Sequence, residues 1–228
     1  MTDTAPVRVR FAPSPTGYMH LGHARTALYG YLLAKQTGGS FMLRVEDTDQ
    51  KRYVADALDN IATGLKWLGL QWDEGPEVGG EFGPYRQTER LEIYNEHVNW
   101  LLENDHAFYC FCSAEHLQQV REEQRKNKIN PHYDGTCRNV SLEEARERIA
   151  NGEKAVVRFK MPKEGSITVH EEMRGNITED LKNLDDYILV KSNGIPVYHL
   201  AAMVDDHLMK ITHVFRGAEW LPSLPQNA

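Results

Sequence analysis

The sequence has no long hydrophobic run. No stretch of about 18 apolar residues occurs among its 228 positions, so no membrane-spanning helix is expected. Residues 1–6 lack the basic and apolar regions of a secretory signal peptide. Internal repeats and low-complexity tracts are also missing. We therefore expect a cytoplasmic protein without a membrane partner, and the hydrophobic content of 41% is enough for a buried core.

Positive charge is scarce. Lys and Arg number 26 against 33 Asp and Glu, which gives a formal net charge of −7. A nucleic-acid partner would have to be held by local basic patches. One candidate is the segment 121–128, although its charge pattern fits a solvated helix face equally well.

Cysteine is also rare. The chain has three, at Cys110, Cys112 and Cys137, which is not a disulfide framework. Such clustering in a cytoplasmic protein favours a metal site, and incidental thiols are the alternative. Zinc needs four ligands in a tetrahedron, and His132 is one chemical candidate for the fourth.

The first third of the chain alternates strand-like and helix-like segments. An apolar run at 8–11 precedes a helical pattern over 20–35, which the Gly-Gly pair at 38–39 ends. A second strand pattern at 41–45 precedes an amphipathic helix over 58–68. This order predicts a parallel sheet with ligands at the carboxyl ends of its strands.

The pattern changes to antiparallel-type elements near residue 105. Strand patterns occur at 156–161, 187–191 and 195–199, and the last two flank a Ser-Asn-Gly turn. We interpret the change as an insertion into the first domain. The predicted domains are 1–105 (first half of the nucleotide-binding domain), 106–196 (the insertion) and 197–228 (the return to the first domain).

The segment 10–23, R-F-A-P-S-P-T-G-Y-M-H-L-G-H, carries the clearest chemical signal. Its Pro/Gly loop brings His20, Gly22 and His23 to a helix N-terminus, where unpaired N–H groups and the helix dipole attract anions. Gly22 allows a flat ligand to approach the backbone, and both histidines can donate to phosphate oxygens. The alternative is a helix start that happens to contain two histidines.

Two charged residues lie at the same expected sheet edge, Arg10 at the end of one strand and Glu46 directly after the next. Arg10 can hold a carboxylate by two parallel hydrogen bonds. Glu46 can hold an α-ammonium group. The alternative for the acidic segment 46–49 is a strand-to-helix turn in which the carboxylates serve as caps.

These strings resemble a known family. The segment 10–23 resembles the H-I-G-H signature of class I aminoacyl-tRNA synthetases in its glutamyl-tRNA synthetase form. The strings R-V-E-D-T-D at 44–49 and V-D-D-H-L-M at 204–209 are also typical of that family. The similarity runs from Val7 to about Pro225. It implies a Rossmann-type parallel sheet, the catalytic fold of class I synthetases, with an inserted α+β domain that binds the tRNA acceptor end.

The resemblance implies ATP- and Mg²⁺-dependent activation of L-glutamate to glutamyl-adenylate, followed by transfer to the 3′ end of tRNA(Glu) by a monomer. His20 and His23 match catalytic positions. The positions that match glutamate-binding residues are Arg10, Ala12, Ser14, Glu46, Tyr198 and Arg216. The positions that match ATP-binding residues are His20, Gly22, His23, Glu219 and Trp220. Ala202 stands where some relatives have an amide side chain that contacts the substrate.

The resemblance also bears on the cysteines. Some family members place a histidine ligand where this chain has Asn139, whereas a related tRNA-modifying branch uses a tyrosine that matches Tyr133. The implied zinc set is Cys110, Cys112, Cys137 and Tyr133, in a structural role.

The family's lysine-rich K-M-S-K-type loop and its anticodon-binding domain do not occur before Ala228. We therefore expect the first part of such an enzyme, with the C-terminal part missing and reduced activity on its own. Two other functions stay open: a glutamyl transferase that modifies a tRNA base, of the glutamyl-queuosine type, and a non-catalytic tRNA-binding fragment.

Overall fold

The computed structural model describes residues 6–227. The chain forms two compact units. Unit 1 comprises Met1–Leu91 and Ala201–Leu221, and unit 2 comprises Glu92–Leu200 and Pro222–Ala228. The chain passes from one unit to the other at 91/92, 200/201 and 221/222, whereas the predicted domain boundaries lie at 105/106 and 196/197. The predicted domain assignment stays a prediction.

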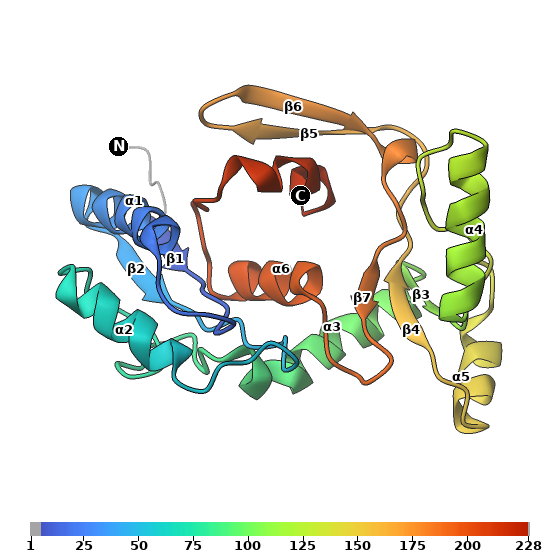
Figure 1. Ribbon diagram of the computed structural model, residues 1–228, viewed down its shortest axis with the longest axis horizontal. Coiled ribbons are helices and arrows are strands. Elements are labelled where there is room, and N and C mark those ends of the chain that lie inside the picture. The colour runs from blue at the N-terminus through green and yellow to red at the C-terminus, as the bar shows by residue number, and fades with distance from the viewer. Residues whose placement is uncertain (1–5, 228) are drawn as a thin grey trace. The chain divides into compact units, whose positions relative to one another are not determined.

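Unit 1 contains the predicted β-α-β-α order (Figure 1). Strands β1 (Arg8–Phe11) and β2 (Ser40–Leu43) pair in parallel, with Arg8 opposite Ser40 and Phe11 opposite Leu43. Helix α1 (Leu21–Thr37) connects them, and α2 (Ala57–Trp67) comes next. The parallel sheet predicted from the sequence is confirmed.

The core of unit 1 lies between these helices and strands. Ala27 and Ala34 of α1 are fully buried because small side chains let the helix lie close to the sheet. Ile61 and Leu65 of α2 are also fully buried, as their spacing of four predicts. Other members of this cluster are Val9, Phe11, Phe41, Leu43, Ala62, Leu70 and Trp72.

Helix α1 ends as the sequence indicates. Gly38 has a φ of 67°, the left-handed conformation that glycine adopts most readily. A Cβ at Gly39 would lie 2.1 Å from the carbonyl oxygen of Val7, so only glycine fits where the chain turns into β2. A short 3-10 helix, η1 (Gln87–Arg90), leads into α3 (Leu91–Glu103), whose last part belongs to unit 2.

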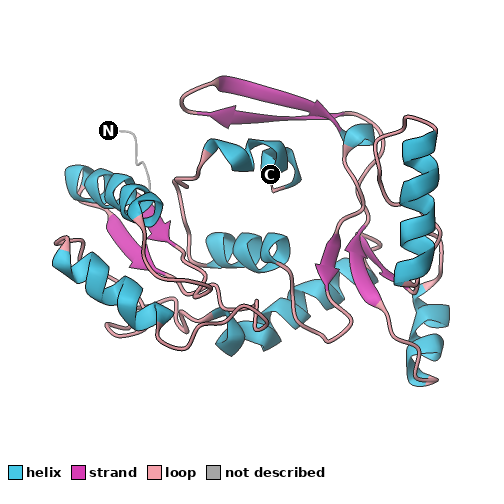
Figure 2. Cartoon of the chain, in the orientation of Figure 1, coloured by secondary structure: helices cyan, strands magenta, loops and turns pink. Residues whose placement is uncertain are grey.

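Unit 2 contains antiparallel pairs, as predicted. Strands β3 (Ala107–Cys110), β4 (Val156–Phe159) and β7 (Ile188–Val190) form one sheet in the order β3-β4-β7. Strands β5 (Ser166–Glu171) and β6 (Gly175–Asp180) form a separate hairpin, drawn in magenta in Figure 2.

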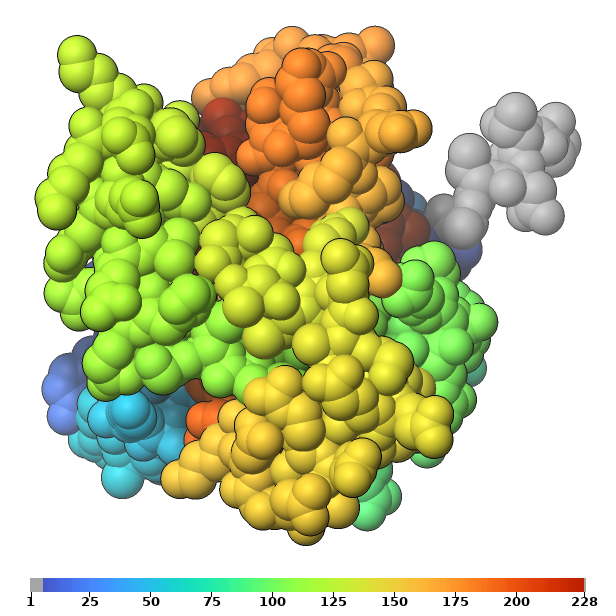
Figure 3. All heavy atoms as spheres, turned by 90° about the vertical axis from the view of Figure 1, so that its right-hand side faces the viewer, coloured from blue at the N-terminus to red at the C-terminus, as the bar shows by residue number. Residues whose placement is uncertain are grey.

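Two capped helices complete unit 2. Ser113 caps α4 (Ala114–Lys126) by accepting from His116 N, and Ser141 caps α5 (Leu142–Ala150) by accepting from Glu144 N. Helix α4, yellow-green in Figure 3, lies on the surface and has no buried residue. The short 3-10 helices are η2 (Leu181–Asn183) and η3 (Ala218–Gln226), of which η3 begins in unit 1.

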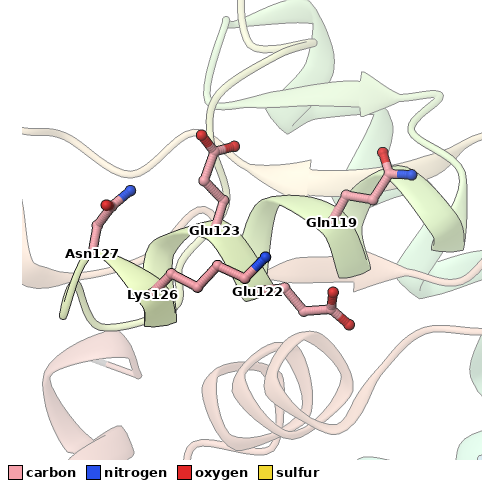
Figure 4. A pocket seen from close by; sticks show the side chains of 5 residues that line it. All are labelled: Gln119, Glu122, Glu123, Lys126 and Asn127. Carbon is pink, nitrogen blue, oxygen red and sulfur yellow. The ribbon is translucent and has the colours of Figure 1, made fainter.

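The basic segment 121–128 is partly neutralised on α4. Figure 4 shows carboxylates projecting from the same helix as Lys126. The residues that line this surface pocket are Gln119, Glu122, Glu123, Lys126 and Asn127. The mixed charge favours the solvated-face interpretation of this segment over a continuous basic patch.

One element prediction is wrong. The turn at 192–194 forms, with Gly194 N donating to Lys191 O at 2.9 Å, but no strand forms over 195–199. One bridge forms, between Val190 and Pro196, flanked by bonds from Lys191 N to Ile195 O and from Val197 N to Leu189 O. The start of helix α6 (Tyr198–Leu208), two residues after Pro196, ends the pairing there.

No helix in residues 6–227 combines the length and apolar character needed to cross a membrane.

Candidate active site and metal centre

The loop between β1 and α1 is fixed on both sides by hydrogen bonds. Glu46 N donates to Pro13 O at 3.0 Å, and Val54 N donates to Pro15 O at 2.9 Å. Met19 N donates to Asn60 Oδ1 of α2 at 2.9 Å. Unit 1 therefore presents the predicted phosphate loop in a defined conformation.

The first turn of α1 is capped by a histidine. His20 Nδ1 accepts from Gly22 N at 3.1 Å, so a neutral His20 carries its proton on Nε2, which is left to donate to a ligand. The imidazole stacks on His23, with ring centroids 3.8 Å apart and planes at 25°. A Cβ at Gly22 would lie 2.9 Å from His20 Cε1. A side chain at position 22 would thus push the capping ring out of its place, in addition to hindering the close approach of a ligand.

His23 is half-buried beneath this cap. Its burial and the proximity of His20 both lower its pKa, which favours the neutral imidazole. Its Nδ1 is buried and makes no hydrogen bond within the part of the chain that the structure describes. The N–H groups and dipole of the helix end supply positive potential beside this half-buried imidazole.

Four charged side chains form a connected network at the carboxyl ends of β1 and β2. Arg10 donates to Asp206 through two nitrogens, Nε to Oδ1 at 3.0 Å and Nη2 to Oδ2 at 3.2 Å. Arg44 Nη1 lies 2.7 Å from Asp206 Oδ1, and Arg44 Nη2 donates to Glu46 Oε1 at 3.0 Å. Arg10 and Glu46, both predicted from the sequence, are thus joined through Arg44 and Asp206.

Burial and charge act in opposite directions in this network. Burial raises the pKa of Glu46, against the effects of Arg44 and Arg10. Burial also opposes ionisation of Asp206, yet Arg10 and Arg44 outweigh it and hold its pKa below the ordinary range. The neighbouring carboxylates raise the pKa of Arg44 despite its complete burial.

Arg216 belongs to the same electrostatic neighbourhood. Burial lowers its pKa to about 10, repulsion by Arg10 and Arg44 adds to this, and Glu46 opposes it. Its guanidinium carbon lies 5.3 Å from the centre of the Trp220 ring.

The other predicted residues are spread more widely. Ala12 is half-buried and Ser14 exposed on the β1–α1 loop, and Glu219 is exposed on η3. Ala202 is fully buried in the part of α6 that belongs to unit 1. Tyr198, the first residue of α6, belongs to unit 2, so its contact with glutamate stays a prediction.

The capping alternative for 46–49 holds for Asp47, whereas Asp49 forms a surface ion pair. Asp47 accepts from both the backbone N and the hydroxyl of Thr88, at 2.9 and 2.7 Å, and so caps η1. Asp49 accepts from Arg52 Nε at 2.7 Å near the surface. Glu46 alone joins the buried network.

Sequence reasoning missed the parts played by Arg44 and Asp206. Arg44 is fully buried directly after an apolar strand, and a charged residue in that setting almost always has a partner. The Asp-Asp pair at 205–206 comes directly after an apolar segment, within one of the strings typical of the family. The sequence contains this signal but does not say which arginine meets which aspartate.

The three cysteines meet in unit 2. Their Sγ atoms all lie within 4.8 Å of one another, and those of Cys112 and Cys137 are 3.6 Å apart. Tyr133 Oη lies 3.4 Å from Cys110 Sγ and 3.8 Å from Cys112 Sγ. A tetrahedral zinc with Zn–S bonds of about 2.3 Å separates its sulfur ligands by roughly 3.8 Å. The spacing therefore fits a zinc ion with little rearrangement.

The sulfurs lie in a mostly apolar cluster that includes Phe108 and Val156, with a few polar groups among them. Cys137 N donates to Tyr133 Oη at 2.8 Å, and Asp185 accepts from Tyr133 N. The pKa of Cys110 is lowered although burial opposes this, because Tyr133, the Cys112 backbone and Arg158 stabilise its thiolate. Burial raises the pKa of Cys112 to about 12.

His132, the chemical alternative for the fourth ligand, is engaged elsewhere. Its Nδ1 contacts Asn130 O at 2.9 Å, and its backbone N donates to Gln124. Among residues 6–227, the set of His, Cys, Asp and Glu close enough to share a metal here consists of the three cysteines.

Comparison with known proteins agrees with this geometry. The chain is 52% identical over 220 residues to glutamate–tRNA ligase 2 of Caldicellulosiruptor saccharolyticus, covering 96% of this chain and 46% of that protein. It is 52% identical to glutamate–tRNA ligase of Ectopseudomonas mendocina, covering 96% and 45%. The chain thus spans just under half the length of the curated relatives it matches.

A solved structure is also similar. The crystal structure of a glutamate tRNA ligase from Elizabethkingia meningosepticum, in complex with its amino acid, superposes with a TM-score of 0.90 at 45% identity, covering 97% of this chain and 45% of that one. The model of the family of class I tRNA synthetases (E and Q), catalytic domain, matches residues 6–228. With a parallel sheet, a histidine-capped helix start and that match over nearly its whole length, the chain belongs to this family of class I tRNA synthetases.

Proposed function

We propose that this chain carries the glutamate-activating part of a glutamate–tRNA ligase. In that reaction a carboxylate of L-glutamate attacks the α-phosphate of ATP, pyrophosphate leaves, and the glutamyl group passes from the adenylate to the 3′ end of tRNA(Glu). The observation that carries the proposal is the network of Arg10, Arg44, Glu46 and Asp206 beside the histidine-capped start of α1.

The charges of the network suit glutamate. Three guanidinium groups (Arg10, Arg44 and Arg216) face Glu46 and Asp206, and the charge of Asp205, 3.7 Å from Arg44, is balanced by Arg90. One positive charge is therefore left in excess when all are ionised. Glutamate carries a net charge of about −1 at neutral pH. We assign Arg10 and Arg216 to the substrate carboxylates and Glu46 to the α-ammonium. Ala12, Ser14 and Tyr198 are the remaining proposed contacts.

The start of α1 suits the phosphates of ATP. The nucleophile is already an anion, so the site needs donors and positive potential rather than a strong base. His20 Nε2, His23 and the first N–H groups of α1 can supply donors, and Gly22 keeps His20 in place. Glu219 and Trp220 are proposed for the adenosine. When bound, Mg²⁺ supplies further neutralisation of phosphate charge.

The cysteine cluster suits a structural zinc held by Cys110, Cys112, Cys137 and Tyr133. Four protein ligands would fill the coordination sphere of the zinc and leave no position open, which is typical of structural rather than catalytic zinc. We assign the segment 106–196 around it to the acceptor end of the tRNA.

The test is glutamate-dependent exchange of pyrophosphate into ATP, with and without tRNA. We expect exchange from the chain itself and its loss in Glu46→Gln. Asp49→Asn is the matched control, because it removes one carboxylate from the same segment but near the surface, and it should retain exchange. Absence of exchange from a folded sample in both conditions would contradict the proposal and leave a binding role.

A second candidate function is a glutamyl transferase that modifies a tRNA base. The observation that favours it is Tyr133 Oη at the sulfur cluster, where the related branch uses a tyrosine ligand. Exchange that needs no tRNA would favour this second function.

A further inference from the structure

Asp206 lies between two groups that the proposed function assigns to glutamate. Its two oxygens accept from Nε and Nη2 of Arg10, which occupies one edge of that guanidinium. Oδ1 also lies 2.7 Å from Nη1 of Arg44. A guanidinium held by one edge is fixed in orientation as well as in position, and its remaining nitrogen points in a defined direction.

Arg44 passes this effect on to Glu46. Its Nη2 donates to Glu46 Oε1 at 3.0 Å, and both side chains are at least 95% buried. Arg44 therefore contacts both Asp206 and Glu46 from the buried interior of unit 1. The order of contacts is Arg10–Asp206–Arg44–Glu46, with one proposed substrate-contacting residue at each end.

The charge count gives Asp206 a second effect. Without its carboxylate, Arg10 would lose its ion-pair partner, and Arg44 would keep only Glu46 and the more distant Asp205, 3.7 Å from its Nε. Arg216 already experiences repulsion from Arg10 and Arg44. An asparagine at 206 would keep one neutral acceptor oxygen in place of the two carboxylate oxygens that Arg10 now contacts, so Arg10 would lose at least one bond and the charge that holds it beside the other two cations.

We propose that Asp206 is a positioning residue for glutamate binding, which orients Arg10 directly and Glu46 through Arg44. The inference rests on the proposed function, because it assigns Asp206 a part in that glutamate site. It differs from a purely structural role, in which the bonds to Arg10 and Arg44 would only fasten α6 to the strands of unit 1. It also differs from a charge-only role, in which removing a carboxylate would tighten the binding of an anion.

The test compares Asp206→Asn with Asp73→Asn. The control removes the same charge in the same unit at the opposite end of β2, where Asp73 accepts from Phe41 N and Lys35. Calorimetry measures binding of L-glutamate and, separately, of ATP. NMR of a ¹⁵N-arginine-labelled sample measures solvent protection of the Arg10 Nε–H, which needs no ligand. Asp206→Glu, which keeps the charge and lengthens the side chain, is the second variant if Asp206→Asn does not fold.

We expect Asp206→Asn to weaken glutamate binding by roughly tenfold or more, as loss of a charged hydrogen bond predicts. ATP binding should stay within about twofold of the unchanged chain, since the groups assigned to ATP lie at the start of α1. The Arg10 Nε–H should lose protection in Asp206→Asn but not in Asp73→Asn. Asp206→Glu should fold and also weaken glutamate binding, because the longer side chain displaces the guanidinium.

Several outcomes would overturn the inference. Equal or tighter glutamate binding by Asp206→Asn would do so, as would an equal loss of ATP binding, which indicates general damage to the fold. If the unchanged chain binds no glutamate, the proposed function fails. In that case the NMR result decides the inference alone: retained protection of the Arg10 Nε–H in Asp206→Asn refutes the orienting role, and lost protection supports it.

Discussion

Replacing Tyr133 by phenylalanine tests the metal site most directly. The hydroxyl has two possible tasks. In the structure, Tyr133 Oη accepts from Cys137 N at 2.8 Å and lies 3.4 Å from Cys110 Sγ. If zinc binds as proposed, the same oxygen is also the fourth ligand. The substitution removes the oxygen and keeps the ring, which packs 4.0 Å from the guanidinium carbon of Arg158.

The two tasks have separable magnitudes. Loss of the acceptor leaves a buried N–H unsatisfied, which costs about 1–3 kcal/mol with or without metal. Loss of a ligand weakens zinc binding, and each tenfold loss of affinity removes about 1.4 kcal/mol from the stability of the zinc-loaded protein. Burial and Cys110 raise the pKa of Tyr133, so zinc must either displace its proton or accept a neutral phenol as a weaker ligand. We therefore expect about tenfold weaker zinc binding rather than its abolition.

The assay is urea unfolding with excess zinc and with a chelator. The chelator should lower the free energy of unfolding of the unchanged chain, and added zinc should restore it. Tyr133→Phe should lower the free energy of unfolding by more in the presence of zinc than in the presence of the chelator. Tyr109→Phe, the same change on β3, is the control and should lose equally in both conditions. An equal loss for Tyr133→Phe would refute the ligand role and leave only the hydrogen bond to Cys137 N.

Three further predictions concern unit 1. His20→Ala should lower the free energy of unfolding, measured with urea, by about 1 kcal/mol because it removes the α1 cap. His20→Asn should retain the cap and still weaken ATP binding, measured by calorimetry. Gly22→Ala gains about 1 kcal/mol of helix propensity, but its Cβ would displace the His20 ring, so we expect weaker ATP binding with little net change in stability. Burial raises the pKa of Glu46, so the folded state binds that proton more tightly than the unfolded chain, and the contribution of Glu46 to stability falls as pH rises above its ordinary pKa of 4.5. Unfolding measured from pH 4 upward should show this fall relative to Glu46→Gln, and a difference that does not change with pH would contradict it.

Local patterns in the sequence predicted the features that depend on neighbouring residues. The strand at 8–11, the helix predicted over 20–35 and its end at Gly38 are determined by alternation, capping and backbone preference within short windows. The cysteine cluster was predicted because rare residues close together in a chain are informative in themselves. The strand β6 was missed because Gly175–Asp180 is mostly polar and is stabilised by its pairing with β5.

Contacts between distant segments could not be predicted in the same way. Arg10 and Arg44 precede Asp206 by most of the length of the chain, and no local pattern indicates which carboxylate each will meet. The expected strand at 195–199 failed for a related reason. The turn at 192–194 forms as predicted, but the conformation of the next residues depends on Pro196 and on the start of α6.

Asp205 and Asp206 are adjacent in sequence, yet on α6 their carboxylates contact different residues. Successive residues on a helix point about 100° apart, so neighbours face different partners. Asp205 is fully buried and accepts from Arg90 Nε at 2.7 Å and Gln87 Nε2 at 3.0 Å, which ties α6 to η1, and it also lies 3.7 Å from Arg44 Nε. Asp206 instead meets Arg10 and is partly accessible. Substitution of Asp205 should therefore chiefly lower stability, because it leaves Arg90 buried without its carboxylate, whereas substitution of Asp206 should chiefly change what the site binds.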